Sequence, residues 1–345
     1  MNTKKAISLF LAFCLVLTFA AGCGGSDETA EPEPAAEPEQ VISVAYYLDE
    51  DHPVDQSMKV FKEYVETNND SLKVELLPGS SQGSEEAYMD SVRDGKIQIG
   101  ITGTMLANEW PLIYAEETPF LFRNWEDAKT YLNGDFSMML FDGLEEDTGL
   151  MHLGTIPLGF REFSCIYNIQ SMDDFRMIRM RVPNEPNYIE MVAALGGAPL
   201  IMDLNDLFDA LEQKSVDGQD NPYSLDYDYG FYKYQQYALE SRHMMSPLNI
   251  FVNAEFFNDS LTDGQRETLI AGMSEAIEHN WEISETYDSE AKQKLIDEGM
   301  EITAPDDELL SAMQEAMAPV YQWYYGEIQG AEEYINAVLT AEGRP

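Results

Sequence analysis

The amino-acid sequence predicts an α/β fold large enough for two lobes, and three observations support this fold class. Segments with strand and helix periodicity alternate from Val41 to Ile101, in the order strand, helix, strand, helix, strand. Without its N-terminal leader the chain keeps about 320 residues, which is enough for two hydrophobic cores. A helix of about 36 residues, predicted between Thr262 and Gly299, would be about 54 Å long, which is longer than one lobe of this size needs.

The first 40 residues are predicted to be a leader and a tether. Lys4 and Lys5 precede an apolar run too short to cross a bilayer, which is typical of a signal peptide over residues 1–22. Cys23 completes A-A-G-C, which resembles a lipoprotein cleavage site, so Cys23 is predicted to carry lipid. Alanine three residues before the cysteine departs from the commonest pattern and leaves ordinary secretory cleavage as an alternative. Residues 23–40, with repeated Glu-Pro pairs, predict an extended acidic tether. The protein is therefore expected outside the cytoplasm, lipid-anchored to the cell membrane or periplasmic.

The first α/β unit follows from hydrophobic periodicity. Its strands are expected at residues 41–47, 72–77 and 97–101. Helices are expected between them, the first opening at His52 and Pro53. Strands connected in this way form a mostly parallel sheet, and ligands bind at the C-terminal ends of such strands. The glycine-rich turn at 79–83 lacks the G-K-[ST] ending of a phosphate-binding loop, so phosphate binding is not predicted there.

The second half of the chain repeats this organisation. A second α/β unit is predicted from Leu153 to Asn221, followed by a strand at 247–253. The long helix after it begins with a capping box formed by Thr262 and Gln265. Apolar residues recur along this helix at three- and four-residue steps until a glycine ends it.

Composition argues against several classes of function. The chain has 63 Asp and Glu against 20 Lys and Arg, a net charge of −43, so it lacks the cations that nucleic-acid binding needs. The same charge repels small anions, so a carboxylate ligand would need a locally positive pocket. The four histidines are scattered, and the sequence has no G-x-S-x-G or H-E-x-x-H motif. No catalytic residue, metal site or cofactor is therefore predicted, and a secreted hydrolase is the competing class.

The stretch from Gly159 to Pro222 holds the candidate binding residues. Arg161 lies in G-F-R, which predicts a turn, and Arg181 lies near the end of an alternating run, 177–182, which predicts a strand. A guanidinium group directed inward needs an anionic partner, because it stays charged and is costly to bury alone. That partner could be a ligand carboxylate, which fits the two-pronged guanidinium, or an internal Asp or Glu. Spacing alone leaves both alternatives open.

Three motifs in this stretch resemble those of a known family. R-V-P begins at Arg181, A-L-G-G-A-P ends at Pro199, and D-A-L-E-Q-K-S-V-D-G-Q-D-N-P ends at Pro222. In this order they resemble the solute-binding proteins of TRAP (tripartite ATP-independent periplasmic) transporters, of the dicarboxylate-type (DctP-like) family. The resemblance implies a two-lobed, periplasmic-binding-protein-like α/β fold with mixed sheets and a long helix spanning both lobes. It also implies lobe boundaries, with lobe I at 41–158 plus 247–286 and lobe II at 159–246 plus 287–345.

The same resemblance implies a function and a binding site. The chain would be an extracytoplasmic receptor that binds a small organic acid between closing lobes and delivers it to TRAP membrane subunits. A ligand-sensing lipoprotein that partners a signalling membrane protein is the alternative. Arg181 would clamp the ligand carboxylate, with Arg161 as a second positive group. The other implied contacts are Asn184, Asn221, Tyr47, Thr102, Met105 and Leu204.

Two residues depart from the family pattern and bear on the ligand. Gly103 stands where some members that bind acidic sugars carry Glu. Leu204 stands where an aromatic residue often stacks on the ligand. Both departures favour an acid that is smaller or more apolar than a large sugar acid.

Overall fold

The computed structural model describes residues 37–176 and 178–344. The chain divides after Glu37, and the residues from Pro38 onward form one compact unit. The predicted signal peptide, most of the tether and the lipid site at Cys23 lie outside the described residues, as does Met177. Within the described ranges, no helix is long and apolar enough to cross a membrane.

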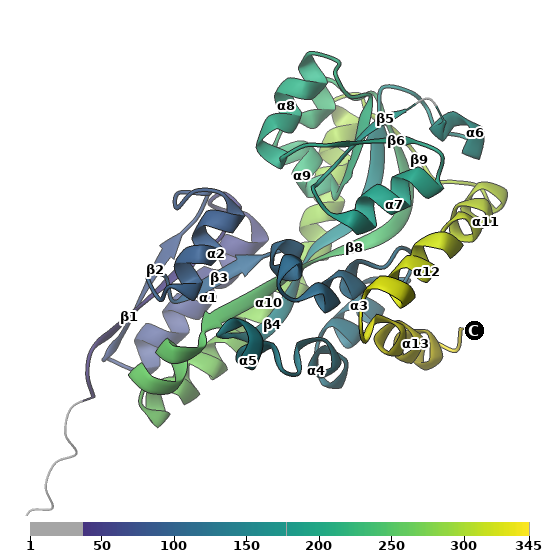
Figure 1. Ribbon diagram of the computed structural model, residues 1–345. Coiled ribbons are helices and arrows are strands. Elements are labelled where there is room, and N and C mark those ends of the chain that lie inside the picture. The colour runs from purple at the N-terminus through teal and green to yellow at the C-terminus, as the bar shows by residue number, and fades with distance from the viewer. Residues whose placement is uncertain (1–36, 177, 345) are drawn as a thin grey trace, which may run out of the picture. The chain divides into compact units, whose positions relative to one another are not determined.

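One mixed sheet of nine strands organises the described residues (Figure 1). The two long strands are β4 (Leu150–Cys165) and β8 (Tyr237–Asn253). The short strands are β1 (Gln40–Ala45), β2 (Leu72–Leu77), β3 (Ile99–Thr102), β5 (Arg179–Val182), β6 (Ala198–Ile201), β7 (Gly218–Asn221) and β9 (Glu301–Thr303). Their order is β2-β1-β3-β8-β4-β7-β5-β6, and β9 pairs with β8. The predicted α/β class is confirmed, with a single continuous sheet where separate sheets were expected.

Pairing directions divide the sheet into two parallel ends. β1 pairs in parallel with β2 and β3, as the predicted strand–helix order requires. β5 pairs in parallel with β6 and β7. Between these groups, β3, β8, β4 and β7 pair antiparallel in succession. We call the two groups the β1–β3 end and the β5–β7 end, and β4 and β8 are the long strands that connect them.

Helices flank both ends of the sheet. The β1–β3 end carries α1 (Pro53–Asn68) and α2 (Glu85–Arg93), followed after β3 by the 3₁₀ segments η1 (Thr104–Asn108) and η2 (Pro111–Glu117). Next come α3 (Trp125–Leu132), α4 (Asp135–Phe141) and α5 (Leu144–Thr148). The β5–β7 end carries α6 (Met172–Phe175), α7 (Pro186–Ala194), α8 (Leu204–Glu212), α9 (Tyr223–Asp228) and η3 (Phe231–Lys233). The remaining helical elements are η4 (Phe256–Ser260), α10 (Asp263–Asp297), α11 (Asp307–Ala316), α12 (Ala318–Glu327) and α13 (Ala331–Ala341).

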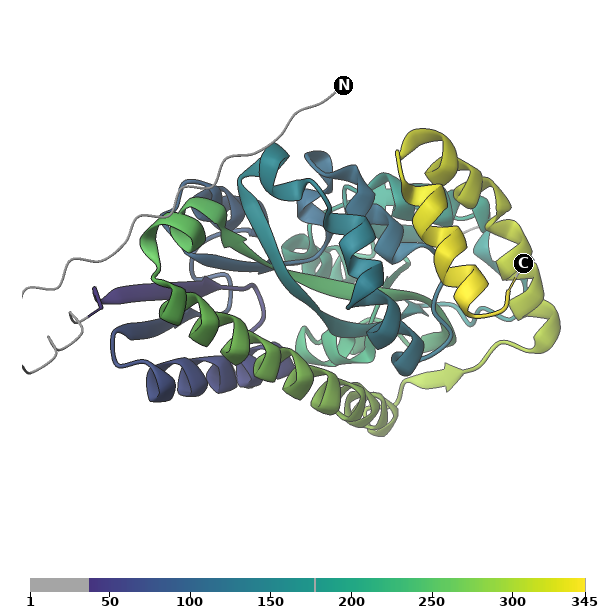
Figure 2. The ribbon, with the colours of Figure 1, turned by 90° about the horizontal axis from the view of Figure 1, so that it is seen from below.

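Helix α10 reaches both ends of the sheet. It begins with the predicted capping box, because the Thr262 hydroxyl accepts from the Gln265 N–H and the Gln265 side chain accepts from the Thr262 N–H. The helix packs on α1 at the β1–β3 end and on α9 at the β5–β7 end, and Figure 2 shows it running along the sheet. Gly299 follows with φ of 100°, a conformation that favours glycine and ends the helix. The two-lobed architecture with a helix spanning both lobes is therefore confirmed.

The predicted lobe boundaries fall inside continuous elements. The boundary at 158/159 lies within β4, the boundary at 246/247 within β8, and the boundary at 286/287 within α10. The backbone thus crosses between the two ends of the sheet through two strands and one helix. The exact boundaries stay predictions.

The predicted turn at Gly159–Arg161 is wrong, because these residues lie inside β4. The β4–β8 register shifts between Pro157 and Gly159 and again after Arg161, so the strand is bulged there. Gly159 has φ of 146°, and a Cβ at this position would lie 2.9 Å from the Cβ of Pro222. Glycine is needed here because no larger residue fits this backbone conformation beside Pro222. The sequence signal was therefore a bulge glycine in a strand rather than a turn glycine.

Buried apolar side chains hold the strand ends in place. One core joins the β1–β3 end to α1 and α10 and includes Ile42, Phe61 and Met273. A second core extends from Phe163 in β4 to Tyr334 in α13. Because protein cores are packed as densely as organic crystals, the residues at the strand ends have little freedom to shift.

Candidate functional site

Most of the residues singled out in the sequence meet at one small cavity. Its volume is about 90 Å³, well below the roughly 300–1,000 Å³ of pockets that hold drug-sized ligands. Six of the eight expected contact residues line it, namely Tyr47, Met105, Arg161, Arg181, Leu204 and Asn221. Except for Arg161 in β4, they lie at or just after the C-terminal ends of parallel strands. This is where ligands bind in α/β sheets.

Thr102 and Asn184 do not line the cavity. The buried Thr102 hydroxyl donates to Oε1 of Glu85 over 2.9 Å, so Thr102 reaches the cavity only through Glu85. Asn184 is exposed and lies two residues before helix α7. Asn187, in the first turn of α7, is buried instead and donates to Oε2 of Glu117 over 3.3 Å.

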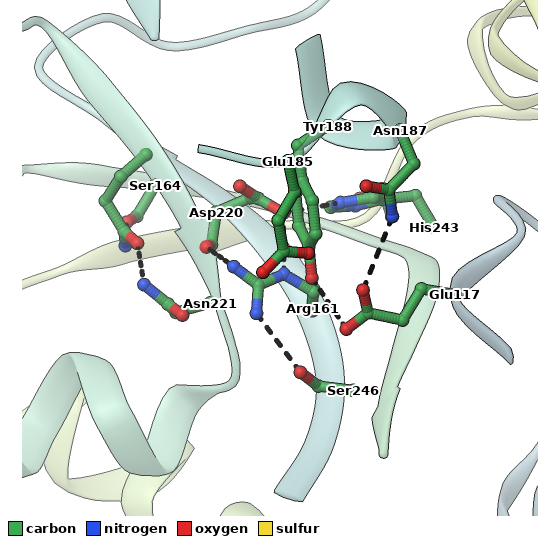
Figure 3. A network of polar contacts seen from close by, with 12 residues as sticks. Glu117, Arg161, Ser164, Glu185, Asn187, Tyr188, Asp220, Asn221, His243 and Ser246 are labelled. Atoms are coloured by element: carbon green, nitrogen blue, oxygen red, sulfur yellow. Dashed lines mark hydrogen bonds and ion pairs between the residues drawn. The ribbon is translucent and has the colours of Figure 1, made fainter. Parts of the chain in front are cut away.

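Arg161 is held by an internal ion pair (Figure 3). Its Nε donates to Oδ2 of Asp220 over 2.7 Å, and its terminal amino groups donate to the Asp220 carbonyl and to the Ser246 hydroxyl. The guanidinium also lies 4.8 Å from the centre of the Tyr188 ring. Burial lowers the pKa of Arg161, but the charge and hydrogen bond of Asp220, together with nearby Tyr188 and Glu117, outweigh burial and hold this pKa above its usual value. Of the two partners left open by the sequence, Arg161 has the internal one.

Asp220 is the matching anion of this pair. It is fully buried, and its Oδ2 also lies 3.2 Å from Nε2 of His243. Burial raises the pKa of the Asp220 carboxyl, but the charge and hydrogen bond of Arg161 and those of His243 together lower it by more, so the net pKa lies below the usual range. Asp220 is therefore ionised and neutralises Arg161 within the protein.

Arg181 has no such partner. Its side chain is buried, with 4% of the residue exposed, and its Nε donates to the Met202 carbonyl over 2.9 Å. No ion pair and no hydrogen bond engages its two terminal amino groups among the residues that the structure describes. Burial, and then the nearby Arg161 charge, lower the pKa of Arg181 to about 10, so it stays protonated at neutral pH. Arg181 is thus a buried cation that presents unpaired donors to the cavity.

A second hollow, of about 1070 Å³, lies beside α4, β4 and α10. Lys129 is the cation in its lining, and its Nζ lies 2.6 Å from Oε2 of Glu278. This hollow therefore offers an anion no unpaired cation comparable to Arg181.

The carboxyl groups of Glu85, Glu117 and Glu185 also line the small cavity, and none of them was among the predicted site residues. Glu117 accepts from the Tyr188 hydroxyl over 2.8 Å, as well as from Asn187. Glu185 is hydrogen-bonded to the Thr104 hydroxyl. Glu85 accepts from Thr102 and from the Gly103 N–H, the latter over 3.2 Å. Burial raises the pKa of all three carboxyls.

The Thr104 hydroxyl connects the carboxyl groups of Glu117 and Glu185, and the two carboxyls hold one acidic proton between them. Its hydroxyl oxygen lies 3.2 Å from Oε2 of Glu117 and also hydrogen-bonds Oε2 of Glu185. A hydroxyl has one hydrogen to donate, so Thr104 can donate to only one of the two carboxyls. The other carboxyl must then carry a proton and donate it to Thr104. The pair therefore carries one negative charge rather than two, which burial of both groups favours.

The sequence did hold a signal for these carboxyls. Glu117 belongs to A-E-E-T-P-F-L, where two acidic residues interrupt an apolar segment, and Glu185 follows R-V-P-N directly. Acidic residues at such positions are buried only when hydrogen bonds or charges compensate them, so they deserved a place among the candidates.

Glu116 predicts a measurable pH dependence of stability. It is fully buried, its Oε1 lacks a partner in the described chain, and burial raises its pKa from 4.5 to about 8. The folded protein therefore keeps a proton that the unfolded chain releases between about pH 4.5 and 8, so the free energy of unfolding falls as pH rises through this window. We expect Glu116→Gln to remove this loss and to raise Tm relative to wild type by at least about 3 °C more at pH 8 than at pH 5.5.

The control for this prediction is Glu86→Gln, which removes the same charge from an exposed position. Its Tm difference from wild type should be the same at both pH values. Parallel pH profiles for wild type and Glu116→Gln, measured by calorimetry at constant ionic strength, would contradict the prediction.

Comparison with known proteins gives one family and a consistent set of structures. Residues 44–327 match the family model described as bacterial extracellular solute-binding protein, family 7. The C4-dicarboxylate-binding periplasmic protein of Rhodobacter capsulatus is 26% identical, over 81% of this chain and 85% of that protein.

Solved structures of two TRAP periplasmic solute-binding proteins share the fold. The protein from Haemophilus influenzae, with bound L-gulonate, is 28% identical with a TM-score of 0.83, over 87% of this chain and 99% of the other. The protein from Desulfovibrio desulfuricans, with bound sn-glycerol-3-phosphate, is 26% identical with a TM-score of 0.84, over 88% and 97%. The chain therefore belongs to the bacterial extracellular solute-binding proteins of family 7, as a TRAP-transporter solute-binding protein.

Proposed function

We propose that the chain is the extracytoplasmic receptor of a TRAP transporter, which binds one small organic acid around Arg181 and delivers it to the membrane subunits. The relatives described above support this proposal, because L-gulonate, sn-glycerol-3-phosphate and C4-dicarboxylates are all anions. They also favour a transporter receptor over a sensor. The observation that carries the proposal is the buried Arg181 guanidinium, whose terminal amino groups have no partner in the described residues.

Arg181 binds the ligand carboxylate through two parallel hydrogen bonds. Its Nε stays on the Met202 carbonyl, which fixes the plane of the guanidinium and leaves both terminal amino groups for the ligand. Asn221 at the end of β7 adds a neutral polar contact, and Arg161, paired with Asp220, adds a positive group that is already neutralised. Charge recognition thus rests mainly on Arg181.

The ligand also connects the two ends of the sheet. Tyr47 and Met105 come from the β1–β3 end, whereas Arg181 and Leu204 come from the β5–β7 end. A molecule that contacts both ends stabilises their approach, because binding free energy favours the conformation with more contacts. The lobes meet where β4, β8 and α10 cross, and these elements bend when the lobes close.

The experiment that tests the proposal is a ligand screen followed by calorimetry. A thermal-shift panel of carboxylic acids with two to six carbons should identify acids that raise Tm, and calorimetry should give one binding site per chain. The bound acid should be recovered unchanged, since a receptor performs no chemistry. Turnover that scales with protein concentration, or a panel in which no acid raises Tm, would overturn the proposal.

We infer that the receptor is tethered through lipid on Cys23, a residue outside the described part of the chain. The support is the A-A-G-C sequence followed by an acidic, Pro-rich spacer. Stable anchoring needs more than one acyl chain. Cys23→Ala should release the protein from membranes or leave its precursor uncleaved, and unchanged membrane retention with unchanged mass would contradict this.

A further inference from the structure

The carboxyl groups in the cavity restrict which acids fit it. Arg161 and Asp220 cancel each other, since they form a buried ion pair. Glu117 and Glu185 both contact the Thr104 hydroxyl, and one of the two carboxyls is protonated. The pair therefore carries one negative charge.

Glu85 adds a further negative charge, against the single positive charge of Arg181. The lining is thus net negative before any ligand enters. A simple carboxylate would add another negative charge to a poorly solvated space, which is unfavourable.

Glu85 also presents an oxygen that no residue in the described part of the chain engages. Both of its donors, the Thr102 hydroxyl and the Gly103 N–H, bind Oε1. Oε2 has no hydrogen-bond donor, and Glu85 forms no ion pair with any Lys or Arg that the structure describes. Glu85 lies at the first position of α2, where the Ser84 cap fixes the start of the helix. Its carboxylate is therefore held in place with one oxygen open to the cavity.

Arg181 and Glu85 line the same cavity but do not pair with each other. Arg181 projects from β5 at one end of the sheet, and Glu85 comes from α2 at the other. Arg181 offers unpaired cationic donors on one side of the cavity, and Glu85 offers an unpaired carboxylate oxygen on the other. A ligand that satisfies both must carry an anionic group and a cationic donor.

We propose that the ligand is a small amino acid, whose carboxylate pairs with Arg181 and whose ammonium group pairs with Glu85. This assignment rests on the proposed function, since it takes the Arg181 cavity to be the binding site. Such a ligand adds no net charge to the cavity and satisfies Oε2 of Glu85. A hydroxy acid could donate a hydrogen bond to that oxygen, but it would bring an uncompensated negative charge. The cavity volume of about 90 Å³ limits the amino acid to a small side chain.

The test uses sets of three acids that share one carbon skeleton. Alanine, lactate and propionate differ only in carrying an ammonium, a hydroxyl or a hydrogen at the same carbon. The second set is 3-aminopropionate, 3-hydroxypropionate and propionate, and the third is 4-aminobutyrate, 4-hydroxybutyrate and butyrate. Calorimetry at pH 7 should show, in at least one set, that the amino acid binds at least tenfold more tightly than both analogues. In the Glu85→Gln protein that preference should disappear.

Glu86→Gln is the matched control, because Glu86 is the next residue of α2 and is exposed outside the cavity. It removes the same charge and should keep the preference for the amino acid. A hydroxy or unsubstituted acid that binds as tightly as its amino counterpart in every set overturns the assignment and leaves the receptor proposal standing. A Glu85→Gln protein that keeps the preference does the same. If no acid of any set binds to the wild type, the receptor proposal fails as well.

Discussion

Replacing Arg181 with methionine should abolish tight ligand binding without destabilising the unliganded protein. Methionine keeps much of the apolar stem and removes a buried cation that has no anionic partner in the described residues. Removing one partner of a desolvated carboxylate pair costs on the order of 2–5 kcal/mol of binding free energy, so affinity should fall by about 30-fold or more. The unliganded protein loses the bond to the Met202 carbonyl and the attraction of Asp220 and Glu185, but it is relieved of the larger costs of a buried cation and of repulsion from Arg161. Its Tm should equal or exceed that of wild type.

Two further measurements separate a ligand-binding Arg181 from a structural one. Arg181→Lys should also bind weakly, because an ammonium keeps the charge but not the planar fork. The amide of the ligand should bind poorly to wild type and lose little more affinity in Arg181→Met. If calorimetry instead shows equal losses for acid and amide, Arg181 does not contact the carboxylate. A large fall in Tm of the unliganded variant would likewise contradict the assignment.

The sequence predicted the position of Arg181 because strand ends can be inferred from periodicity. Arg181 is the second-last residue of β5 and Asn221 is the last residue of β7. Because these two strands pair in parallel, their C-terminal ends lie at the same edge of the sheet. Asn184 does not line the cavity, whereas Asn187 is buried and bonds Glu117, because α7 begins at Pro186 and the sequence did not show where this helix starts. A shift of a few residues at a helix start changes which side chain points inward, and boundaries are the least certain part of such predictions.

The partner of Arg161 could not be predicted, because it depends on long-range strand pairing. In the β4–β7 ladder, Glu162 lies opposite Asn221 and Phe163 opposite Asp220. This antiparallel pairing joins segments 59 residues apart in sequence, and the bulges in β4 set its register. With 63 acidic residues available, composition could not identify Asp220. The link between Glu117 and Glu185 could not be predicted for the same reason, since Thr104 connects the two carboxyls only in the folded chain.

Replacing Asp220 with asparagine should destabilise the protein by about 3–5 kcal/mol, because it leaves the Arg161 guanidinium buried without a counter-charge. Both side chains of the pair are almost fully buried, so solvent cannot replace the lost interaction. Urea unfolding monitored by circular dichroism should show the loss as a lower midpoint with an unchanged slope.

Asp173→Asn is the matched control, since Asp173 pairs with Arg176 and both side chains are exposed, Arg176 to 70% and Asp173 to 76%. An exposed pair contributes at most about 1 kcal/mol, so this variant should lose far less stability. A loss of similar size in both variants would mean that burial does not determine the strength of the Arg161 pair.

The double variant Arg161→Met with Asp220→Asn tests whether the ion pair serves stability alone or also ligand binding. Removing both charges leaves neither ion unpaired, so the double variant should recover much of the stability lost in Asp220→Asn. Its affinity for the ligand should also stay within a few-fold of wild type, because the Arg161 guanidinium already donates to Asp220 and Ser246. Arg181→Met in the same assay should lose about 30-fold or more. If the double variant loses as much affinity as Arg181→Met, then Arg161 contacts the ligand directly, and charge recognition is shared between the two arginines.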